Sequence, residues 1–453
     1  MINTGDTPIT DARRQLNLYQ IIVVVFQHVF SFFGATVLVP MITGLSVQRA
    51  LLFAGIGTLI FHVLTKFKVP AFLGSSFAFL GGFSMMENNS IYGQLPADER
   101  LAYACGGMVV AGLMYLILAL IIKIVGVKHV MRFLPPVVTG PIIVCIGLSL
   151  APSAIANAST NWLLALVAIV TIIVCNIWGK GMIKIIPILM GVIVSYIVAL
   201  ILNAAGVITL DFTQVAEARL IGLPPLQLAK FGLSAILIMA PISLATMMEH
   251  VGDISAISAT TGNNFVEDPG LHRTLVGDGL ATSIASIFLG PANTTYGENT
   301  GVLALTKIYD PFLIRLAAVV AILLGLLPKV AAVINTMPAA IIGGISFVLY
   351  GMISAIGVRN MYENHVSLAK SRNLIIVSVI LVCGLGFSDG LTFAVGTTSI
   401  TLTGLAIASI AGIILNAVLP GKDYEFGRDP NGDANRGIAI NTREPKDTET
   451  SNV

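Results

Sequence analysis

The sequence predicts an all-α membrane protein that crosses the bilayer many times. Of its 453 residues, 56% are hydrophobic and only 11% are charged, whereas soluble domains are about a quarter charged. Apolar runs of roughly 20 residues, long enough to span a bilayer, recur along most of the chain. Two of these runs are broken by glycine, proline and small polar residues. Together these observations predict a polytopic helical protein with irregular backbone at membrane depth.

About fourteen candidate spans follow from this length rule. They centre near residues 18–42, 49–66, 69–86, 103–126, 132–152, 161–178, 182–202, 232–256, 274–290, 291–307, 312–334, 337–357, 372–388 and 392–418. Several are short or broken, so twelve to fourteen spans are compatible with the sequence. The first run is too long for a signal peptide and is predicted to be a helix. Residues 419–453 are rich in Asp, Asn, Gly, Pro and Thr, which predicts a disordered tail.

The basic residues predict the orientation, because cytoplasmic loops carry an excess of Lys and Arg. We place the N-terminal segment 1–15 and the tail in the cytoplasm and the polar linker 203–230 outside. Of the 25 Lys and Arg residues, those that then fall outside are Arg49, Arg100, Arg219, Lys230 and Lys329. An odd number of spans would move the tail outside and weaken this bias.

Two pairs of similar segments indicate an internal repeat. Leu134-Pro135 and Met337-Pro338 each open an apolar span, and Gly74-Ser75-Ser76 in the third span resembles the segment that begins at Leu289 in the tenth. Seven spans in each half would make the two repeats inverted, which is a design of secondary transporters. Chance similarity between Gly- and Pro-rich apolar segments is the alternative.

The third and tenth spans are predicted to be broken at equivalent places. Gly74-Ser75-Ser76 interrupts one, and Asn293-Thr294-Thr295 the other. Two short antiparallel strands could pair where the spans cross, and Phe77-Ala78-Phe79 alternates as a short strand would. The half-helices after the breaks would then direct N–H groups at a cavity. Hinges, or tight packing through small residues, are the alternative for either break.

Acidic residues mark the candidate site. Glu298 lies in the tenth span beside irregular backbone, and carboxylates at membrane depth usually face a cavity or a partner. Glu249 and Asp253 in the eighth span are four residues apart and share one helix face, which a kink at Pro241 could re-aim. A cytoplasmic helix end with solvated charges is the alternative.

Other polar residues in the spans are interpreted as structural. His250 is expected to point away from the Glu249 face, and Asp278 to lie at a helix end. Gln27 and His28 in the first span are expected first to make an interhelical hydrogen bond and second to support the site.

The sequence contains no nucleophile–base spacing, metal-ligand cluster, phosphate-binding loop or nucleotide-binding domain. The four cysteines lie in apolar runs without disulfide or metal spacing. We therefore expect no enzyme activity, no metal or other cofactor and no nucleic-acid partner. A primary pump is disfavoured, so an ion gradient would supply the energy. A buried glutamate can exchange a proton, which favours proton coupling over sodium.

The acidic segments resemble the nucleobase–cation symporter family, also called nucleobase–ascorbate transporters, in its uracil-permease branch. The run Glu298-Asn299-Thr300-Gly301, followed by Thr306-Lys307, is similar to the family signature. Gln27-His28, Gly74–Phe77, Glu249–Gly252 and Asn293–Asn299 are also similar. The resemblance extends from about residue 16 to residue 418.

The resemblance implies fourteen spans in two inverted repeats of seven. A core domain would contain spans one to four (16–126) and eight to eleven (231–334), and a gate domain spans five to seven (127–202) and twelve to fourteen (335–418). Family members are cation-coupled symporters and are commonly dimers, so we expect a homodimer in the inner membrane.

Carried onto this chain, the resemblance assigns substrate-binding roles. Glu249 and Glu298 would bind the nucleobase, Phe77 would stack on it, and backbone N–H groups near Phe77 and Gly297 would meet its carbonyls. Asp253, His28, Gln27, Asn299 and Thr295 would support the site or the proton transfer.

The expected function is uracil–proton symport. Purine carriers of this family typically have Gln at the position of Glu298, which favours uracil. Some uracil permeases carry His where this chain has Asp253, so a xanthine, uric acid or other purine substrate is the alternative. An anion transporter of similar architecture would be expected to use a basic or neutral site, which the two glutamates oppose.

Overall fold

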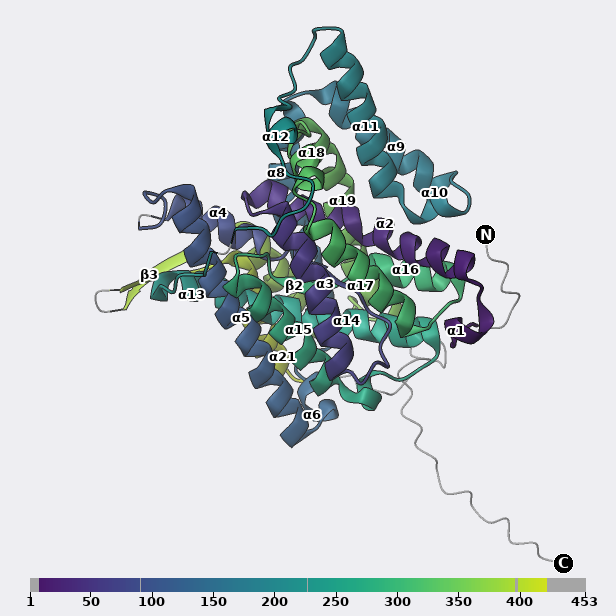
Figure 1. The fold of residues 1–453 in the computed structure, drawn as a ribbon. Coiled ribbons are helices and arrows are strands. Elements are labelled where there is room, and N and C mark those ends of the chain that lie inside the picture. Colours follow the sequence, from purple (N-terminus) through teal and green to yellow (C-terminus); the bar gives the residue numbers. More distant parts are fainter. Residues whose placement is uncertain (1–7, 90, 226, 396–397, 422–453) are drawn as a thin grey trace, which may run out of the picture.

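A computed structural model describes residues 8–89, 91–225, 227–395 and 398–421, and Figure 1 shows that the chain is built mainly of helices. The ends of the expected cytoplasmic segments, residues 1–7 and 422–453, lie outside the described residues, so the predicted disorder of the tail is not tested there.

The first half of the chain contains twelve helices and one strand among the described residues. They are α1 (Ala12–Gln15), α2 (Leu18–Thr43), α3 (Val47–Leu64), β1 (Leu73–Ser75), α4 (Leu80–Asn88), α5 (Ala97–Val125), α6 (Val127–Met131), α7 (Pro136–Ser149), α8 (Ala151–Ser159), α9 (Trp162–Ile177), α10 (Met182–Ile185), α11 (Pro187–Ala204) and α12 (Thr213–Glu217).

The second half contains nine helices, two helical turns and three strands among the described residues. Its elements are α13 (Leu233–Met239), the 3₁₀ turn η1 (Ala240–Ile242), α14 (Ser243–Thr261), the π-helical turn η2 (Val266–Gly270), α15 (Leu271–Ile287), β2 (Asn293–Thr295), α16 (Gly297–Thr306), α17 (Pro311–Gly325), α18 (Pro328–Asn335), α19 (Ala339–Glu363), α20 (Ser371–Gly386), β3 (Leu391–Val395), β4 (Thr398–Leu402) and α21 (Gly404–Val418). The turn η1 interrupts the eighth predicted span at Pro241, where the sequence allows a kink.

Seven helical segments among the described residues are long and apolar enough to cross a membrane, namely α2, α3, α5, α7 with α8, α11, α13 with α14, and α19, which agrees with a multi-pass protein. The pair α17 and α18 would form an eighth span, bent by 78°. Of the three shorter apolar helices, α9 and α20 coincide with predicted spans, and α21 coincides with the second half of the last one. The count of fourteen stays a prediction.

Glycine contacts allow the long helices to approach closely. A Cβ atom on Gly112 of α5 would lie 2.5 Å from the carbonyl oxygen of Gly279 of α15. On Gly55 of α3 it would lie 2.4 Å from the carbonyl oxygen of Ala318 of α17. Since no side chain separates the backbones, these helices pack at the short distance typical of small residues in membranes.

The predicted pairing of the third and tenth spans is confirmed. β1 and β2 form a two-stranded antiparallel sheet in which Leu73 pairs with Thr295 and Ser75 with Asn293. The prediction of a strand at Phe77–Phe79 was wrong, because the chain turns there into α4, with Leu80 N donating to Phe77 O at 3.1 Å. Each strand is too short to cross the bilayer, and pairing satisfies its backbone groups.

The prediction that residues 392–418 form one helical span was wrong in its first half. Residues 391–402 contain an antiparallel hairpin, β3 and β4, which projects at the left of Figure 1, and the helix begins only at Gly404. Threonines and β-branched residues around Thr398–Leu402 favour extended backbone, and Thr403 caps the helix through Ala406 N.

The polar linker is fastened to its surroundings by several hydrogen bonds. Gln48 of α3 donates to Gly222 O at 3.4 Å, and Lys230 N donates to Ala102 O at 3.0 Å. The helices that precede the linker, α9 and α11, lie side by side at the top of Figure 1. The linker therefore joins these helices to α13 while it also contacts α3 and α5.

Candidate functional site

The crossing of β1 and β2 fixes the starts of two short helices. Ser76 N donates to Ala292 O at 2.8 Å, and Tyr296 N donates to Phe72 O at 3.0 Å, which extends the pairing beyond the strands. α4 follows β1 and α16 follows β2. The first N–H groups of a helix have no partner within the helix, so both starts can donate to an acceptor.

Buried side chains hold the crossing in place. Tyr296 OH donates to Ser75 O at 3.0 Å, and Ser75 Oγ donates to Thr36 O at 2.9 Å, which ties both strands to α2. On the other side, Thr282 of α15 donates to Asn293 O at 2.8 Å and accepts from Asn293 N at 3.2 Å. The irregular backbone is therefore satisfied by neighbouring helices, as the membrane interior requires.

Gly297 and Glu298 form the first turn of α16. Gly297 is exposed, and a Cβ atom there would meet only Asp253 Oδ1, at 3.8 Å. One turn further on, a Cβ atom on Gly301 would meet nothing within 4 Å. The glycines leave open space along one side of the turn that carries Glu298.

Glu249 and Asp253 come from α14, which packs on α16. Asp253 Oδ1 lies beside the first turn of α16, next to Gly297, and α14 also packs on α15, the helix that carries Asp278. Glu249 Oε2 is buried without a hydrogen-bond partner among the described residues. Asp253 Oδ2 accepts from Thr295 Oγ1 at 2.7 Å. The structure therefore brings together the acidic residues that the sequence places in different spans.

The aromatic rings of Phe77 and Tyr350, which come from different parts of the fold, contact each other edge to face. Phe77 follows β1, and Tyr350 lies on α19; their ring centroids are 6.1 Å apart at an interplanar angle of 74°. Both residues are buried. The sequence analysis did not single out Tyr350, because a tyrosine inside an apolar run carries no local sign of its partner.

His28 makes the interhelical hydrogen bond expected of it. Its Nδ1 lies 3.1 Å from Asn299 Nδ2, so the unprotonated nitrogen accepts, and this contact joins α2 to the first turn of α16. Gln27 is also buried, and its Oε1 has no partner among the described residues.

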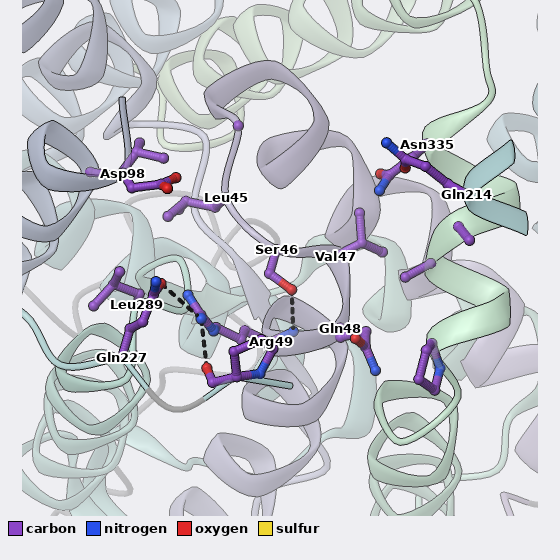
Figure 2. A pocket seen from close by; sticks show the side chains of 16 residues that line it. Leu45, Ser46, Val47, Gln48, Arg49, Asp98, Gln214, Gln227, Leu289 and Asn335 are labelled. Atoms are coloured by element: carbon purple, nitrogen blue, oxygen red, sulfur yellow. Dashed lines mark hydrogen bonds between the residues drawn. The ribbon is translucent and has the colours of Figure 1, made fainter. Parts of the chain in front are cut away.

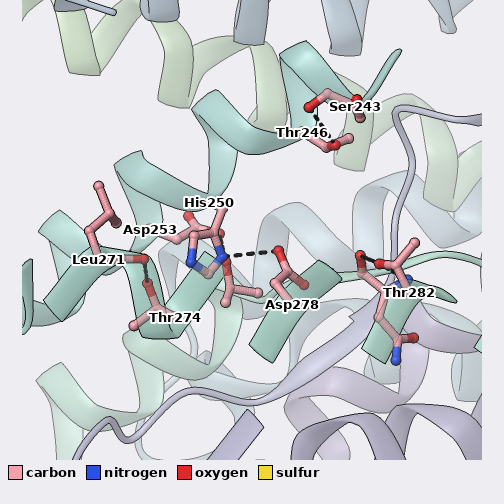
Figure 3. Close-up of polar contacts among 10 residues, drawn as sticks. Ser243, Thr246, His250, Asp253, Leu271, Thr274, Asp278 and Thr282 are labelled. Carbon is pink, nitrogen blue, oxygen red and sulfur yellow. Dashed lines mark hydrogen bonds and ion pairs between the residues drawn. The ribbon is translucent and has the colours of Figure 1, made fainter. Parts of the chain in front are cut away.

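The expectation that Asp278 lies at a helix end was wrong. Asp278 lies inside α15 and is fully buried, with its Oδ2 3.0 Å from His250 Nδ1, as Figure 3 shows. The two atoms lie at ion-pair distance but are not aligned for a hydrogen bond. The rings of Phe61 and Tyr115 contact His250 edge-on. The contact between His250 and Asp278 joins α14 to α15, which is a structural role of the kind expected of His250.

Two cavities lie away from these acids. One, of about 420 Å³, is drawn in Figure 2 and includes Arg49, Asp98 and Gln227 in its lining. Arg49 Nη2 donates to Pro225 O at 2.6 Å and to Gln227 Oε1 at 3.0 Å, so Arg49 fastens the linker to α3. The other, of about 480 Å³, lies beside Lys68 and Asp268. In the described part of the chain, no three His, Cys, Asp or Glu side chains are arranged to hold a metal ion.

These features define a class: a helical, multi-pass membrane protein with carboxyl groups buried beside two paired, broken segments. The protein-family model described as "Permease family" matches residues 19–392, and the chain belongs to that family. It is therefore a membrane transporter and not an enzyme.

Relatives and solved structures agree with this assignment. The uracil permease of Bacillus caldolyticus is 38% identical over 430 residues, which are 92% of this chain and 95% of that protein. The probable uracil permease of Haemophilus influenzae is 39% identical over 92% of this chain and 98% of its own length. The transmembrane domain of a cyanobacterium bicarbonate transporter, BicA, has a similar fold, with a TM-score of 0.63 at 15% identity, covering 90% of this chain and all of that domain.

Proposed function

We propose that the protein imports uracil together with a proton across the inner membrane. The observation that carries this proposal is the position of Glu298 in the first turn of α16, directly after the β1–β2 crossing, where α16 packs on α14, the helix that carries Glu249. The relatives named uracil permease support the choice of substrate.

The chemistry of uracil suits this arrangement. Uracil is a flat ring with two N–H donors and two carbonyl acceptors. The carboxyl groups of Glu249 and Glu298 would accept from the donors, while the backbone N–H groups near Phe77 and Gly297 would donate to the carbonyls. Phe77 would stack on the ring and close the site on one side.

Transport would follow from movement of a gate domain against a core domain. The proposed core contains α2–α5 and α13–α18, and the proposed gate α6–α11 and α19–α21. Phe77 belongs to the core and Tyr350 to the gate, so their contact would change as the two domains move. Substrate would reach Glu298 alternately from either side of the membrane.

The pattern of helix contacts supports an inverted seven-span repeat. If span n of the first half corresponds to span n + 7, the pair α5·α15 corresponds to α17·α3, and the pair α9·α11 to α20·α21. In each of these four pairs, the two helices pack against each other. The strands β1 and β2, which would be each other's counterparts in the repeat, are also in contact. The full count of fourteen spans and a homodimeric assembly form part of the same proposal.

Proton coupling would use the carboxyl groups that surround the proposed site. Asp253 accepts from Thr295 and lies beside Gly297, the residue before Glu298, so it would exchange a proton with the substrate-binding group. Cytoplasmic termini and an external linker are proposed from the distribution of Lys and Arg. Gln27, His28 and Asn299 would hold α2 against α16.

A purine such as xanthine or uric acid is the second candidate substrate. The observation that favours it is Asp253, which stands where some uracil permeases carry His. Coupling to sodium in place of the proton would be the corresponding alternative for the driving ion.

Uptake of radiolabelled uracil in cells that lack their own permease tests the proposal. We expect uptake that excess unlabelled uracil abolishes, that xanthine leaves unchanged and that a protonophore collapses. Glu298→Gln and Glu249→Gln should each lower uptake by at least about tenfold, since each removes a charge-assisted hydrogen bond. Glu217→Gln, an exposed change in α12, is the matched control.

Each part of the proposal has its own contradicting result. Inhibition by xanthine but not by uracil would refute the substrate. Full uptake in the presence of the protonophore, together with dependence on sodium, would refute proton coupling. Full activity of both glutamine variants would refute the site.

A further inference from the structure

The segment that precedes the first long helix is docked on the far end of α16. Ile9 N donates to Lys307 O at 2.9 Å, and Tyr309 N donates to Ile9 O at 2.8 Å, so Ile9 and Ile308 form a parallel β-bridge. Ala12 N donates to Asp310 Oδ2 at 2.8 Å. We name residues 8–16 the N-terminal clasp.

The clasp is packed as well as hydrogen-bonded. Ala12 is fully buried, and so is Ile308 on the opposite side of the bridge. The guanidinium carbon of Arg13 lies 4.0 Å from the ring centroid of Phe312 in α17, a cation–π contact. Asp310 also accepts from Phe312 N through Oδ1 and thereby caps α17. The clasp therefore closes on the turn between α16 and α17.

α16 is a short helix, so its direction depends on the elements that contact it, including the N-terminal clasp. The helix has 10 residues and is about 15 Å long, which is too short for stability without tertiary contacts. β2 and the His28–Asn299 contact fix its first turn, while Gly297 and Gly301 leave one side open. Its last turn ends at Lys307, where the clasp begins to pair. The direction of α16 is thus set by its packing on α14 and α2 and by the contacts at its two ends, of which the clasp holds the last turn.

We propose that the N-terminal clasp positions α16 and, through it, the carboxyl group of Glu298. Ile9, Arg13 and Asp310 are positioning residues in this inference. They lie at the opposite end of α16 from Glu298 and do not contact it. They would act by fixing the direction of the helix, which determines where its first turn places Glu298. The inference rests on the proposed binding role of Glu298 and adds to it a cytoplasmic segment on which that role depends.

Three substitutions release the clasp in different ways. Ile9→Pro removes the backbone donor to Lys307 O, whereas Ile9→Ala keeps it. Asp310→Ser keeps one oxygen to cap α17 but loses the second oxygen that accepts from Ala12 N. Arg13→Ala removes the contact with Phe312. Arg14→Ala is its matched control, since Arg14 is exposed and pairs with Asp11 at 3.4 Å.

Two measurements on the purified full-length protein test the proposal. Hydrogen–deuterium exchange of residues 297–306 reports the stability of α16 without a ligand, and exchange of α9 shows whether the whole protein is perturbed. The Kd for uracil reports the position of Glu298. In Ile9→Pro and Asp310→Ser we expect exchange in 297–306 to rise about tenfold and the Kd to rise about fivefold, the effect of losing one or two hydrogen bonds.

The outcomes are distinguishable. Unchanged exchange in 297–306 overturns the clasp, and so does faster exchange with an unchanged Kd, because Glu298 would then be positioned by other contacts. A parallel rise in α9 would mean general unfolding and would also overturn it. If the unsubstituted protein binds no uracil while exchange in 297–306 still responds to Ile9→Pro, the proposed substrate fails and the contact between clasp and helix stands.

Discussion

The hydroxyl group of Thr295 donates a hydrogen bond of 2.7 Å to Oδ2 of Asp253, and this contact joins β2 to α14. It connects the backbone crossing to the helix that carries Glu249. The other oxygen of the same carboxyl group, Oδ1, would lie 3.8 Å from a Cβ atom on Gly297, so Asp253 also lies beside the start of α16.

Replacement of Thr295 by valine tests the importance of that hydrogen bond. Valine preserves the shape and removes the donor, and loss of a hydrogen bond to a carboxylate costs about 1.5 kcal/mol. We expect uracil uptake to fall about tenfold. Thr294→Val is the matched control, because the Thr294 hydroxyl is buried without a partner in the described ranges. Equal losses in both variants would show that the effect comes from the strand and not from Asp253.

Replacement of Asp278 by alanine should destabilise the protein. The change leaves His250 buried without its acidic neighbour, and removing one member of a buried pair costs about 3 kcal/mol. We expect a lower Tm of the purified protein in detergent and a smaller yield of folded protein. Glu217→Ala, on an exposed part of the linker, should leave the Tm unchanged. A Tm equal to that of the unsubstituted protein in Asp278→Ala would contradict a structural role.

Substitutions of Tyr350 test its contact with Phe77. An edge-to-face aromatic pair contributes about 1 kcal/mol beyond burial, so Tyr350→Ala should raise the Kd for uracil about fivefold. Tyr350→Phe keeps the ring and should stay near the unsubstituted value. Tyr362→Ala removes an exposed tyrosine from the same helix and serves as the control. If Tyr350→Phe is as damaging as Tyr350→Ala, the hydroxyl group and not the ring carries the effect.

Replacement of Gly279 by valine tests the close packing of α5 and α15. A Cβ atom at Gly279 would lie 2.6 Å from the carbonyl oxygen of Gly112, so the helices must separate. Overpacking of this kind costs about 2 kcal/mol, and we expect reduced folded protein in size-exclusion profiles. Gly351→Ala places a methyl group where nothing lies within 4 Å and should be tolerated. Normal folding of Gly279→Val would mean that this helix contact is adaptable.

Much of the fold could be predicted because membrane proteins are constrained locally. Apolar length identifies spans, and Gly74-Ser75-Ser76 and Asn293-Thr294-Thr295 mark the breaks, since small polar residues are poor helix formers. The pairing of the two breaks followed from the need to satisfy backbone groups in the bilayer. The pairing of β3 with β4 was missed because a short apolar run can be either a strand or part of a helical span, and the length rule alone does not separate the two.

The sequence by itself determined the class of protein, the broken segments and the acidic residues Glu249, Asp253 and Glu298. Those features depend on composition, on local backbone preference and on spacing along one helix. Only the tertiary structure decided that Asp278 meets His250, that Tyr350 faces Phe77 and that Ile9 pairs with Ile308. These contacts join residues far apart in the chain, so no periodicity encodes them, and they form only when the helices pack.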